Sequence, residues 1–264
     1  MKTLAALTLG LITIHRPALA QDREPDAVYL TGEADSSRTF AGGAAQAEWV
    51  HGVSSQSSII VGGGSTAIAD LHWNYGLVGG FMRRHRVVYA GRIGLGGGRT
   101  LEGGFPYARY VGSVAVPIGG SVHGEAEAQY VSVAGNAATV FKVGSVYSGI
   151  RRTSLRVSYY STLSAASHAH LVSGLGEWSA ARFSVLGGAT TAPGSERTVA
   201  VAPTDLSTRP STEFFGGASV AVGKSRLIGS VQIVPQTSGT LIRVVTTLKL
   251  ALKHSEEPPR QDAQ

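Results

Sequence analysis

The chain has 264 residues, with 35 glycines, no cysteine and a formal net charge of +6 at pH 7. Without cysteine there is no disulfide framework. The glycine content argues against a helical protein, because glycine costs about 1 kcal/mol per helical position relative to alanine. The basic residues do not cluster in one run, so nucleic acid is not an expected partner. No segment of the chain is apolar over the roughly 20 residues that a transmembrane helix needs, so no transmembrane helix is predicted.

The first twenty residues have the pattern of a secretory signal. Lys2 precedes an apolar run from Leu4 to Ile14, and Ala18-Leu19-Ala20 supplies the small residues that a signal peptidase requires. This run is too short for a helix that spans a bilayer, which takes about 20 residues. We therefore predict a cleaved signal peptide over 1–20, with a short membrane tether as the alternative.

The remainder of the chain repeats short runs in which apolar and polar residues alternate. The stretches YARYVGSVAVPI (107–118) and LIRVVTTLKLALK (241–253) are examples. Each run has about ten residues, which is the length a tilted strand needs to cross the hydrocarbon layer. The pattern predicts an all-β transmembrane antiparallel up-and-down β-barrel over 21–254. A polar tail that we expect to be disordered follows over 255–264.

The runs add up to fourteen predicted strands, the first at 27–34 and the last at 241–253. Twelve strands is the alternative count, because IIVGGGSTAIAD within 57–70 fits either one strand or a hairpin. Tight and often basic turns are expected at 82–86, 117–121, 149–154, 178–182 and 223–226. Longer loops are expected at 96–106, 134–139, 163–168 and 192–210. Short turns face the periplasm in outer-membrane barrels, so the basic turns, the start of the first strand and the end of the last strand are predicted there.

The stretch SVHGEAEAQYVSVAG (121–135) shows most clearly how the two sides of a strand differ. Glu125 and Glu127 stand on one side, and Ala126, Ala128 and Tyr130 stand on the other. In a membrane barrel the apolar side faces lipid and the charged side faces a wet lumen. The same rule predicts a lumen-lining charge cluster made of Arg92, Arg109, Glu125, Glu127, Arg156, Arg243 and Lys249.

Further expectations follow from the same alternation of apolar and polar sides. We expect Arg182 to join the cations of the lumen and the two glutamates to pair with Arg109 and Arg156, because barrel charges persist when they are paired or hydrated. The more apolar side of 71–81, which includes Trp73, is expected to face lipid. Aromatic girdles at the membrane interfaces would account for the three tryptophans Trp49, Trp73 and Trp178. A soluble β-sandwich whose core holds the apolar sides is the alternative architecture.

The order of these hairpins resembles the YaiO-type outer-membrane β-barrel family of Gram-negative bacteria. The matching segments are WNYGLVGGFMRRHRVVYAGRIGLG, YARYVGSVAVPIGGSVHGEAEAQYV and GSVYSGIRRTSLRVSYYSTLS, within about 44–249. The resemblance implies an integral protein of the cell outer membrane, similar to the barrels that end exopolysaccharide-export porins. The sequence departs from this family in two ways. Many members end on an aromatic residue, whereas the last strand here ends LKLALKH, and a polar tail follows it.

No pattern of an enzyme or of a cofactor site is found, and no catalytic residue, metal or cofactor is predicted. There is no Gly-x-Ser-x-Gly elbow, His-Glu-x-x-His pair or phosphate loop. His168 and His170 have the spacing of two residues on one side of a strand, but no third metal ligand is found beside them. Most histidines are expected on the inner side or in turns.

The sequence thus predicts a non-enzymatic outer-membrane barrel with a basic lumen, either a narrow or partly obstructed channel or an export-associated structural barrel. Expected partners are outer-membrane lipid and lipopolysaccharide, the barrel assembly machinery, and anionic solutes or exopolysaccharide as cargo. A lipid-modifying barrel enzyme, such as a deacylase or phospholipase, is the alternative function.

Overall fold

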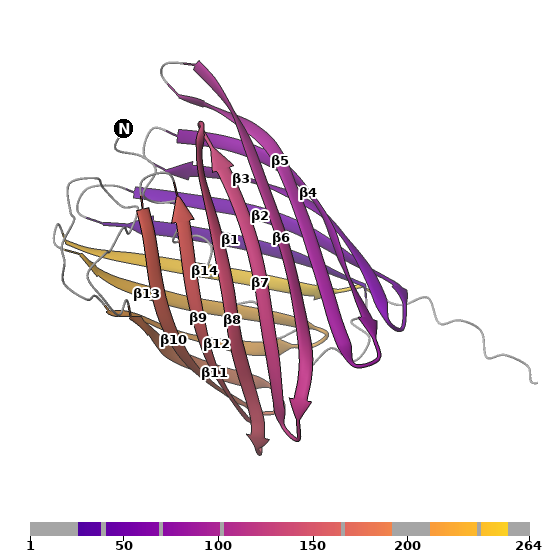
Figure 1. Ribbon diagram of the computed structural model, residues 1–264. Helices are drawn as coiled ribbons and strands as arrows, with labels where there is room; N and C mark the ends of the chain where they lie inside the picture. The colour runs from indigo at the N-terminus through magenta and orange to yellow at the C-terminus, as the bar shows by residue number, and fades with distance from the viewer. Residues whose placement is uncertain are drawn as a thin grey trace, which may run out of the picture.

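The computed structural model describes residues 26–37, 41–68, 71–100, 103–164, 167–191, 212–236 and 239–252. These residues form one closed antiparallel β-barrel of fourteen strands, which run obliquely side by side around a common axis (Figure 1). The predicted signal peptide, the polar tail and the predicted loop at 192–210 lie outside the described residues. The prediction of a fourteen-stranded barrel is confirmed, and a sandwich of two packed sheets is excluded.

Strands that follow one another in sequence pair with one another, and the first strand closes the ring by pairing with the last. The register joins Ala27 to Ala251 and Ser36 to Ile242. The stretch 57–68 forms one strand and not a hairpin, which settles the strand count. The strands are β1 Ala27–Ser36, β2 Ala41–Ser54, β3 Ser57–Ile68, β4 Leu71–Arg84, β5 Val87–Thr100, β6 Gly103–Gly119, β7 Val122–Val133, β8 Asn136–Ile150, β9 Thr153–Ser164, β10 Ser167–Ser179, β11 Phe183–Thr191, β12 Thr212–Val222, β13 Ser225–Gln236 and β14 Gly239–Ala251.

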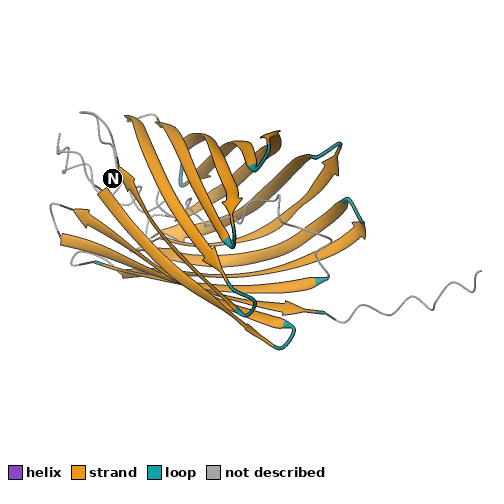
Figure 2. Ribbon diagram, turned by 90° about the horizontal axis from the view of Figure 1, so that it is seen from below, coloured by secondary structure: helices purple, strands orange, loops and turns teal. Residues whose placement is uncertain are grey.

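Several strands extend further than the sequence predicted. The predicted loop at 96–106 is mostly strand, since β5 continues to Thr100 and β6 begins at Gly103. The predicted loops at 134–139 and 163–168 likewise shrink to short connections between paired strands. The glycines of GGGRTLEGGFP at 96–98 and 103–104 pair within the sheet, although glycine in a strand interior usually weakens it. Figure 2 shows that the described residues are strand almost throughout, joined by short turns. No helix among the described residues is long and apolar enough to cross a membrane.

The two ends of the barrel differ in their connections. We call the end that holds the turns at 55–56, 85–86, 120–121, 151–152, 180–182 and 223–224 the turn end. The opposite end, which holds the longest connection, between β11 and β12, is the loop end. The residue before β1 and the residue after β14 also lie at the turn end, where the Leu252 N–H donates to the Asp26 carbonyl.

The outer face of the barrel is covered by large hydrophobic side chains. Val78, Val143 and Val157 are each more than half exposed. Aromatic residues on this face form two groups, one nearer each end. The turn-end group is Trp49, Tyr89, Tyr147, Trp178 and Phe183, and the loop-end group is Tyr110, Tyr130, Phe141, Tyr159 and Phe214. Two of the three predicted girdle tryptophans, Trp49 and Trp178, therefore lie on the outer face.

Trp73 does not lie with the other two tryptophans, and the expected orientation of β4 is wrong. Trp73 is 3% exposed and packs inside the barrel beside Leu71 and Tyr107. The outward side of β4 carries His72, Asn74, Val78 and Met82 instead. Both sides of this strand hold apolar residues, so polarity could not tell them apart. The interior near the loop end is itself apolar, and it accepts the aromatic side.

Three basic residues adopt a left-handed backbone conformation in the turns. His85 (φ 50°) and Arg86 (φ 71°) form the turn between β4 and β5, and Arg152 (φ 62°) lies in the turn between β8 and β9. This conformation costs a residue with a side chain about 1–2 kcal/mol. Hairpin turns that need it prefer asparagine and glycine. The basic side chains are therefore kept at positions where the backbone favours other residues.

Candidate functional site: the charged lumen

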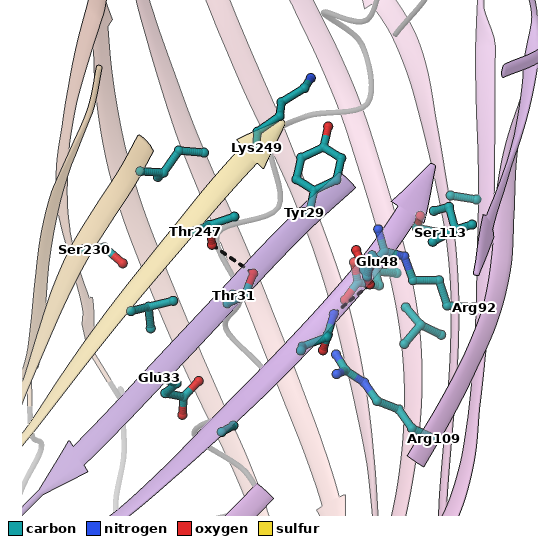
Figure 3. A pocket seen from close by; sticks show the side chains of 18 of the residues that line it. Tyr29, Thr31, Glu33, Glu48, Arg92, Arg109, Ser113, Ser230, Thr247 and Lys249 are labelled. Carbon is teal, nitrogen blue, oxygen red and sulfur yellow. Dashed lines mark hydrogen bonds and ion pairs between the residues drawn. The ribbon is translucent and has the colours of Figure 1, made fainter. Parts of the chain in front are cut away.

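The candidate site is a cavity of about 500 Å³ inside the barrel, lined by residues from most of the strands. All seven residues of the predicted charge cluster lie on its wall. Figure 3 shows this interior, with Arg92 extending toward Glu48 and Arg109 pointing into the same space. Arg182 does not line the cavity, because it lies exposed in the turn between β10 and β11.

An ion pair crosses the interior between β2 and β5. Arg92 Nη1 lies 2.9 Å from Glu48 Oε1. The amide of Gln46 donates to the same carboxylate oxygen over 2.7 Å, and the hydroxyl of Tyr75 donates to the Gln46 amide oxygen over 2.6 Å. This network ties β2, β4 and β5 together across the inner surface. Glu48, the anionic partner, was not among the predicted lumen residues.

Glycines on β3 and β4 leave the room that this network occupies. A Cβ on Gly79 would lie 2.8 Å from Cγ of Arg92, and a Cβ on Gly64 would lie 2.6 Å from the hydroxyl oxygen of Tyr75. Both distances are shorter than real Cβ contacts. The glycines of IIVGGGS and LVGGF therefore let long polar side chains lie flat against the sheet.

A second cluster surrounds Glu125 on β7. Lys142 Nζ lies 2.9 Å and Arg156 Nε 3.4 Å from Glu125 Oε1, and the Ser158 hydroxyl is 3.4 Å from the same atom. The predicted contact with Arg156 is therefore present, while Lys142 on β8 takes the place expected for Arg109. Lys142 stands directly opposite Glu127 in the strand register. Its position in FKVGSV, which alternates in the same way as the other strands, would have revealed it.

A third cluster lies at the loop end, between β1 and β14. Arg243 holds Asp35 with two hydrogen bonds, Nε to Oδ1 at 2.7 Å and Nη2 to Oδ2 at 2.9 Å. Nε also lies 2.9 Å from Glu33 Oε1. Arg243 is 4% and Asp35 3% exposed, so this group is buried. Closure of the ring places Arg243 beside two carboxylates more than 200 positions away in sequence, a contact that local patterning does not reveal.

Arg109 and Glu127 differ from the paired charges of the cavity wall. Arg109 on β6 and Glu127 on β7 have no group of opposite charge within 4.0 Å among these residues. Arg109 also has a buried Nε without a hydrogen-bond partner there. Near the turn end, the ammonium of Lys249 lies 5.2 Å from the centroid of the Tyr29 ring. Arg109 is therefore a cation of the wall whose charge no carboxylate of the described residues neutralises.

An apolar cluster narrows the interior toward the loop end. Trp73 stacks on Tyr107 with ring centroids 6.0 Å apart, and Tyr75 lies 5.2 Å from Tyr107. The other buried members are Ile68, Leu71, Val131 and Val133. These side chains come from β3, β4, β6 and β7 and pack together near the loop end.

The cavity wall is less basic than the sequence predicted. Its described residues include seven cations and five anions. Asp35 and Glu213, which are both 3% exposed, add two more carboxylates beside Arg243 and Gln232. The acidic partners were missed because four of them lie in strands whose patterns were not resolved: Glu33, Asp35, Glu48 and Glu213.

His72, His168 and His170 project from the outer face near the loop end. For His72 this differs from the prediction, which placed it on the polar, inner side of its strand, whereas His85 lies in a turn as predicted. The rings of His168 and His170 have centroids 4.2 Å apart. No group of three potential metal ligands occurs among the described residues. The histidine pair remains a two-ligand arrangement.

Two of these histidines make hydrogen bonds with serines of the neighbouring strand. Ser65 Oγ lies 3.0 Å from His72 Nε2, and Ser161 Oγ lies 3.0 Å from His168 Nε2. His170 Nδ1 also meets the hydroxyl of Tyr159. The outer wall near the loop end thus holds two pairs of serine and histidine.

No protein-family model matches the chain, and no curated protein resembles it in sequence. Solved structures do resemble it in shape. A bacterial polysaccharide outer membrane secretin superposes with a TM-score of 0.62 at 10% identity, covering 87% of this chain and 99% of its own. The Pseudomonas putida toluene transporter TodX gives 0.62 at 8% identity and covers 95% and 92%. The KdgM porin in complex with disordered oligogalacturonate gives 0.51 at 8% identity and covers 85% and 99%. These likenesses show that the chain has the fold of outer-membrane β-barrels.

Proposed function

We propose that the chain is a narrow, partly obstructed channel of a Gram-negative outer membrane, of the YaiO type and without enzymatic activity, which favours anionic solutes or exopolysaccharide. The outer face supports a membrane location. Exposed valine, leucine, isoleucine and aromatic side chains surround the barrel, an apolar surface far larger than a soluble monomer normally exposes. The two aromatic groups stand where interface girdles stand in membrane barrels.

The observation that carries the channel proposal is the charged cavity with Arg109 on its wall. Most lumen cations are neutralised by a carboxylate within 4.0 Å, but Arg109 is not paired within the described residues. An anion that entered the cavity would meet this guanidinium without displacing a bound carboxylate. A cation would find Glu127 on the neighbouring strand β7, which has no cationic partner within 4.0 Å among the described residues. The selectivity of the lumen should therefore depend on these two residues more than on the paired ones.

Planar-bilayer recordings of the refolded chain test this proposal. Wild type should conduct with a modest preference for anions. Arg109→Gln should shift the preference toward cations, and Glu127→Gln should shift it toward anions by a similar amount. The two substitutions each remove one charge, on the neighbouring strands β6 and β7. Both leave the Glu48–Arg92 and Glu125–Lys142 pairs in place. A cation-selective wild type, or the absence of any change with Arg109→Gln, would contradict the proposal.

The lipid-modifying alternative has a specific observation in its favour. The Ser65–His72 pair adjoins a groove of about 380 Å³, lined in part by His72, Asn74 and Arg99. A serine nucleophile needs a histidine base within hydrogen-bond reach, and this pair meets that condition. A fluorophosphonate probe distinguishes the two functions. Labelling that Ser65→Ala removes and Ser161→Ala does not would favour the enzyme, whereas an unlabelled protein that conducts ions would favour the channel.

A further inference from the structure

The turn end of the barrel carries a ring of exposed basic residues that the channel proposal leaves without a role. Its members come from four of the six turns. We define the basic rim as Arg84, His85, Arg86, Arg151, Arg152, Arg182 and Lys224. All seven are exposed. Because the turns follow one another around the barrel, the rim surrounds a large part of this end.

The rim is not neutralised by acidic residues in the turns. None of the six turns contains aspartate or glutamate. The nearest acidic groups of this end are Asp26, which bonds to the His51 ring over 2.8 Å, and Glu177, which accepts from the Ser179 hydroxyl. The lumen, in contrast, pairs most of its charges. The net positive charge of the described barrel is therefore concentrated on the rim.

The position of the rim relative to the membrane follows from the residues just beside it. Trp178 and Phe183 stack edge to face with centroids 5.3 Å apart, on either side of the turn that holds Arg182. Tyr147 and Tyr89 take the same position beside the other two arginine-bearing turns. Aromatic side chains of this kind mark the boundary between hydrocarbon and headgroups. The rim, one step further out, falls in the headgroup layer.

Apolar side chains accompany the basic ones at the same level. Ile118, Ile150 and Val222 are the last residues or near the last residues of their strands, and each is at least half exposed. A vestibule that guided a soluble polymer would have little use for exposed isoleucine and valine beside its cations. A bilayer interface accepts both, because the apolar groups enter the acyl boundary while the cations stay at headgroup level.

The backbone gives an independent reason to regard these basic residues as selected. His85, Arg86 and Arg152 occupy left-handed conformations, whereas glycine occupies them at Gly120 and Gly223 in two other turns. Asparagine and glycine would suit the strained turns better. Strained residues that persist point to a role outside the turn itself.

We propose that the basic rim is a docking surface for the headgroups of anionic phospholipids in the leaflet that meets the turn end. This proposal rests on the membrane location proposed above, but not on the passage of solutes. The rim would gather phosphate-bearing, net negative headgroups, such as those of phosphatidylglycerol, from a mixed leaflet. On the predicted orientation this is the periplasmic leaflet, so the rim would help to fix the direction and depth of the barrel.

Quenching of tryptophan fluorescence by brominated lipid can measure the composition of this leaflet around the barrel. Trp178 and Trp49 lie on the outer face in the turn-end half, and Trp73 is buried inside. The full chain, refolded in vesicles of phosphatidylcholine mixed with brominated phosphatidylglycerol, reports how often the anionic lipid occupies sites beside them. We expect several-fold enrichment of phosphatidylglycerol over phosphatidylcholine at low salt. The enrichment should fall as salt screens the interaction.

The rim variant H85N/R86G/R151Q/R152G/R182Q/K224Q should bring the enrichment of phosphatidylglycerol over phosphatidylcholine close to one. The changes at 85, 86 and 152 suit the turns, so the variant should fold, and heat-modifiable migration on a gel checks that it does. Arg99→Gln is the matched control, because Arg99 is exposed on the outer face at the loop end. It should leave the enrichment unchanged.

Three outcomes would overturn the proposal. Wild type could quench equally with both lipids, the rim variant could retain the enrichment, or Arg99→Gln could reduce it as much as the rim variant does. Binding of polygalacturonate to the embedded wild type, with no preference for phosphatidylglycerol, would show that the rim serves an acidic polymer and not lipid. None of these results bears on ion selectivity, so the channel proposal would stand or fall separately. If wild type showed no heat-modifiable migration, both the channel proposal and the rim proposal would be contradicted.

Discussion

Basic side chains of the lumen and of the basic rim differ in whether a carboxylate lies beside them. Inside the barrel, Arg243, Arg92 and Lys142 each lie within 3.0 Å of a carboxylate oxygen. On the rim, six arginine or lysine side chains share four turns that contain no acidic residue. The difference follows from solvation. A charge shielded from water must be paired or its cost is several kcal/mol, whereas a charge in the headgroup layer keeps its water and remains available to a partner.

The comparison separates two tasks of basic residues in this fold. Paired lumen charges fasten distant strands to one another, as Glu48 and Arg92 do across β3 and β4. Unpaired charges can act on something outside the chain. By this criterion Arg109 and the rim are the candidates for binding. The paired lumen cations Arg92, Lys142, Arg156 and Arg243 are first of all structural.

The largest effect should come from breaking the buried cluster at the barrel closure. Arg243→Ala leaves the buried Asp35 and the partly buried Glu33 without their cation. Removing one partner of a buried ion pair typically costs about 3–5 kcal/mol. We expect a loss of this size in the free energy of unfolding, measured by urea titration of the barrel in detergent micelles with heat-modifiable migration as the readout.

The triple variant R243M/E33Q/D35N is the control for this prediction. It removes all three charges together, and replacing a complete buried charge group by uncharged residues is often close to neutral. It should therefore recover most of the lost stability. If Arg243→Ala cost no more than a surface substitution, which is about 0.5 kcal/mol or less, the cluster would not fasten β1 to β14.

The architecture was readable from the sequence because a membrane barrel repeats one rule along its whole length. Alternation in 87–96, 107–116 and 241–250 placed Arg92, Arg109 and Arg243 on the lumen side, where the structure has them. The strand number also followed from this repetition. Where both sides of a strand are apolar, as in β4, the rule has nothing to compare, and Trp73 was assigned to the wrong side.

The partners of the lumen charges were harder to predict than their sides. Arg92 reaches past two strands to Glu48, and Arg243 meets residues from the opposite end of the chain. Such contacts depend on register and ring closure, which a single strand pattern does not contain. Strand patterning also gave no role to Gly64 and Gly79, which leave the space that Tyr75 and Arg92 fill.

An intermediate effect should follow when that space is filled. A Cβ at Gly79 would lie 2.5 Å from the Gly91 carbonyl oxygen and 2.8 Å from Cγ of Arg92. Gly79→Val should displace Arg92 from Glu48 and destabilise the barrel by about 1–3 kcal/mol, the usual range for overpacking. Gly76→Val is the matched control on the same strand. Its Cβ would meet nothing within 4 Å and would point outward, so stability should stay close to that of wild type. Equal effects of the two variants would show that the space beside Arg92 is not needed.

The smallest expected effect separates the rim from the lumen most directly, because here the removal of charge should stabilise the fold. His85 and Arg86 both hold the left-handed conformation that a type I′ turn requires. The double variant H85N/R86G supplies the residues that this turn prefers. Relief of the left-handed penalty, about 1–2 kcal/mol for a residue with a side chain, is offset by roughly 0.5–1 kcal/mol of chain entropy at the new glycine. We therefore expect a net gain of about 0.5–1 kcal/mol in the free energy of unfolding in neutral detergent. Arg182→Gln, in a turn whose residues have no left-handed backbone outlier, should leave this free energy unchanged. A loss of stability in H85N/R86G would mean that the two basic side chains make contacts within the fold. The rim would then belong with the paired charges of the lumen and would not be free to bind lipid.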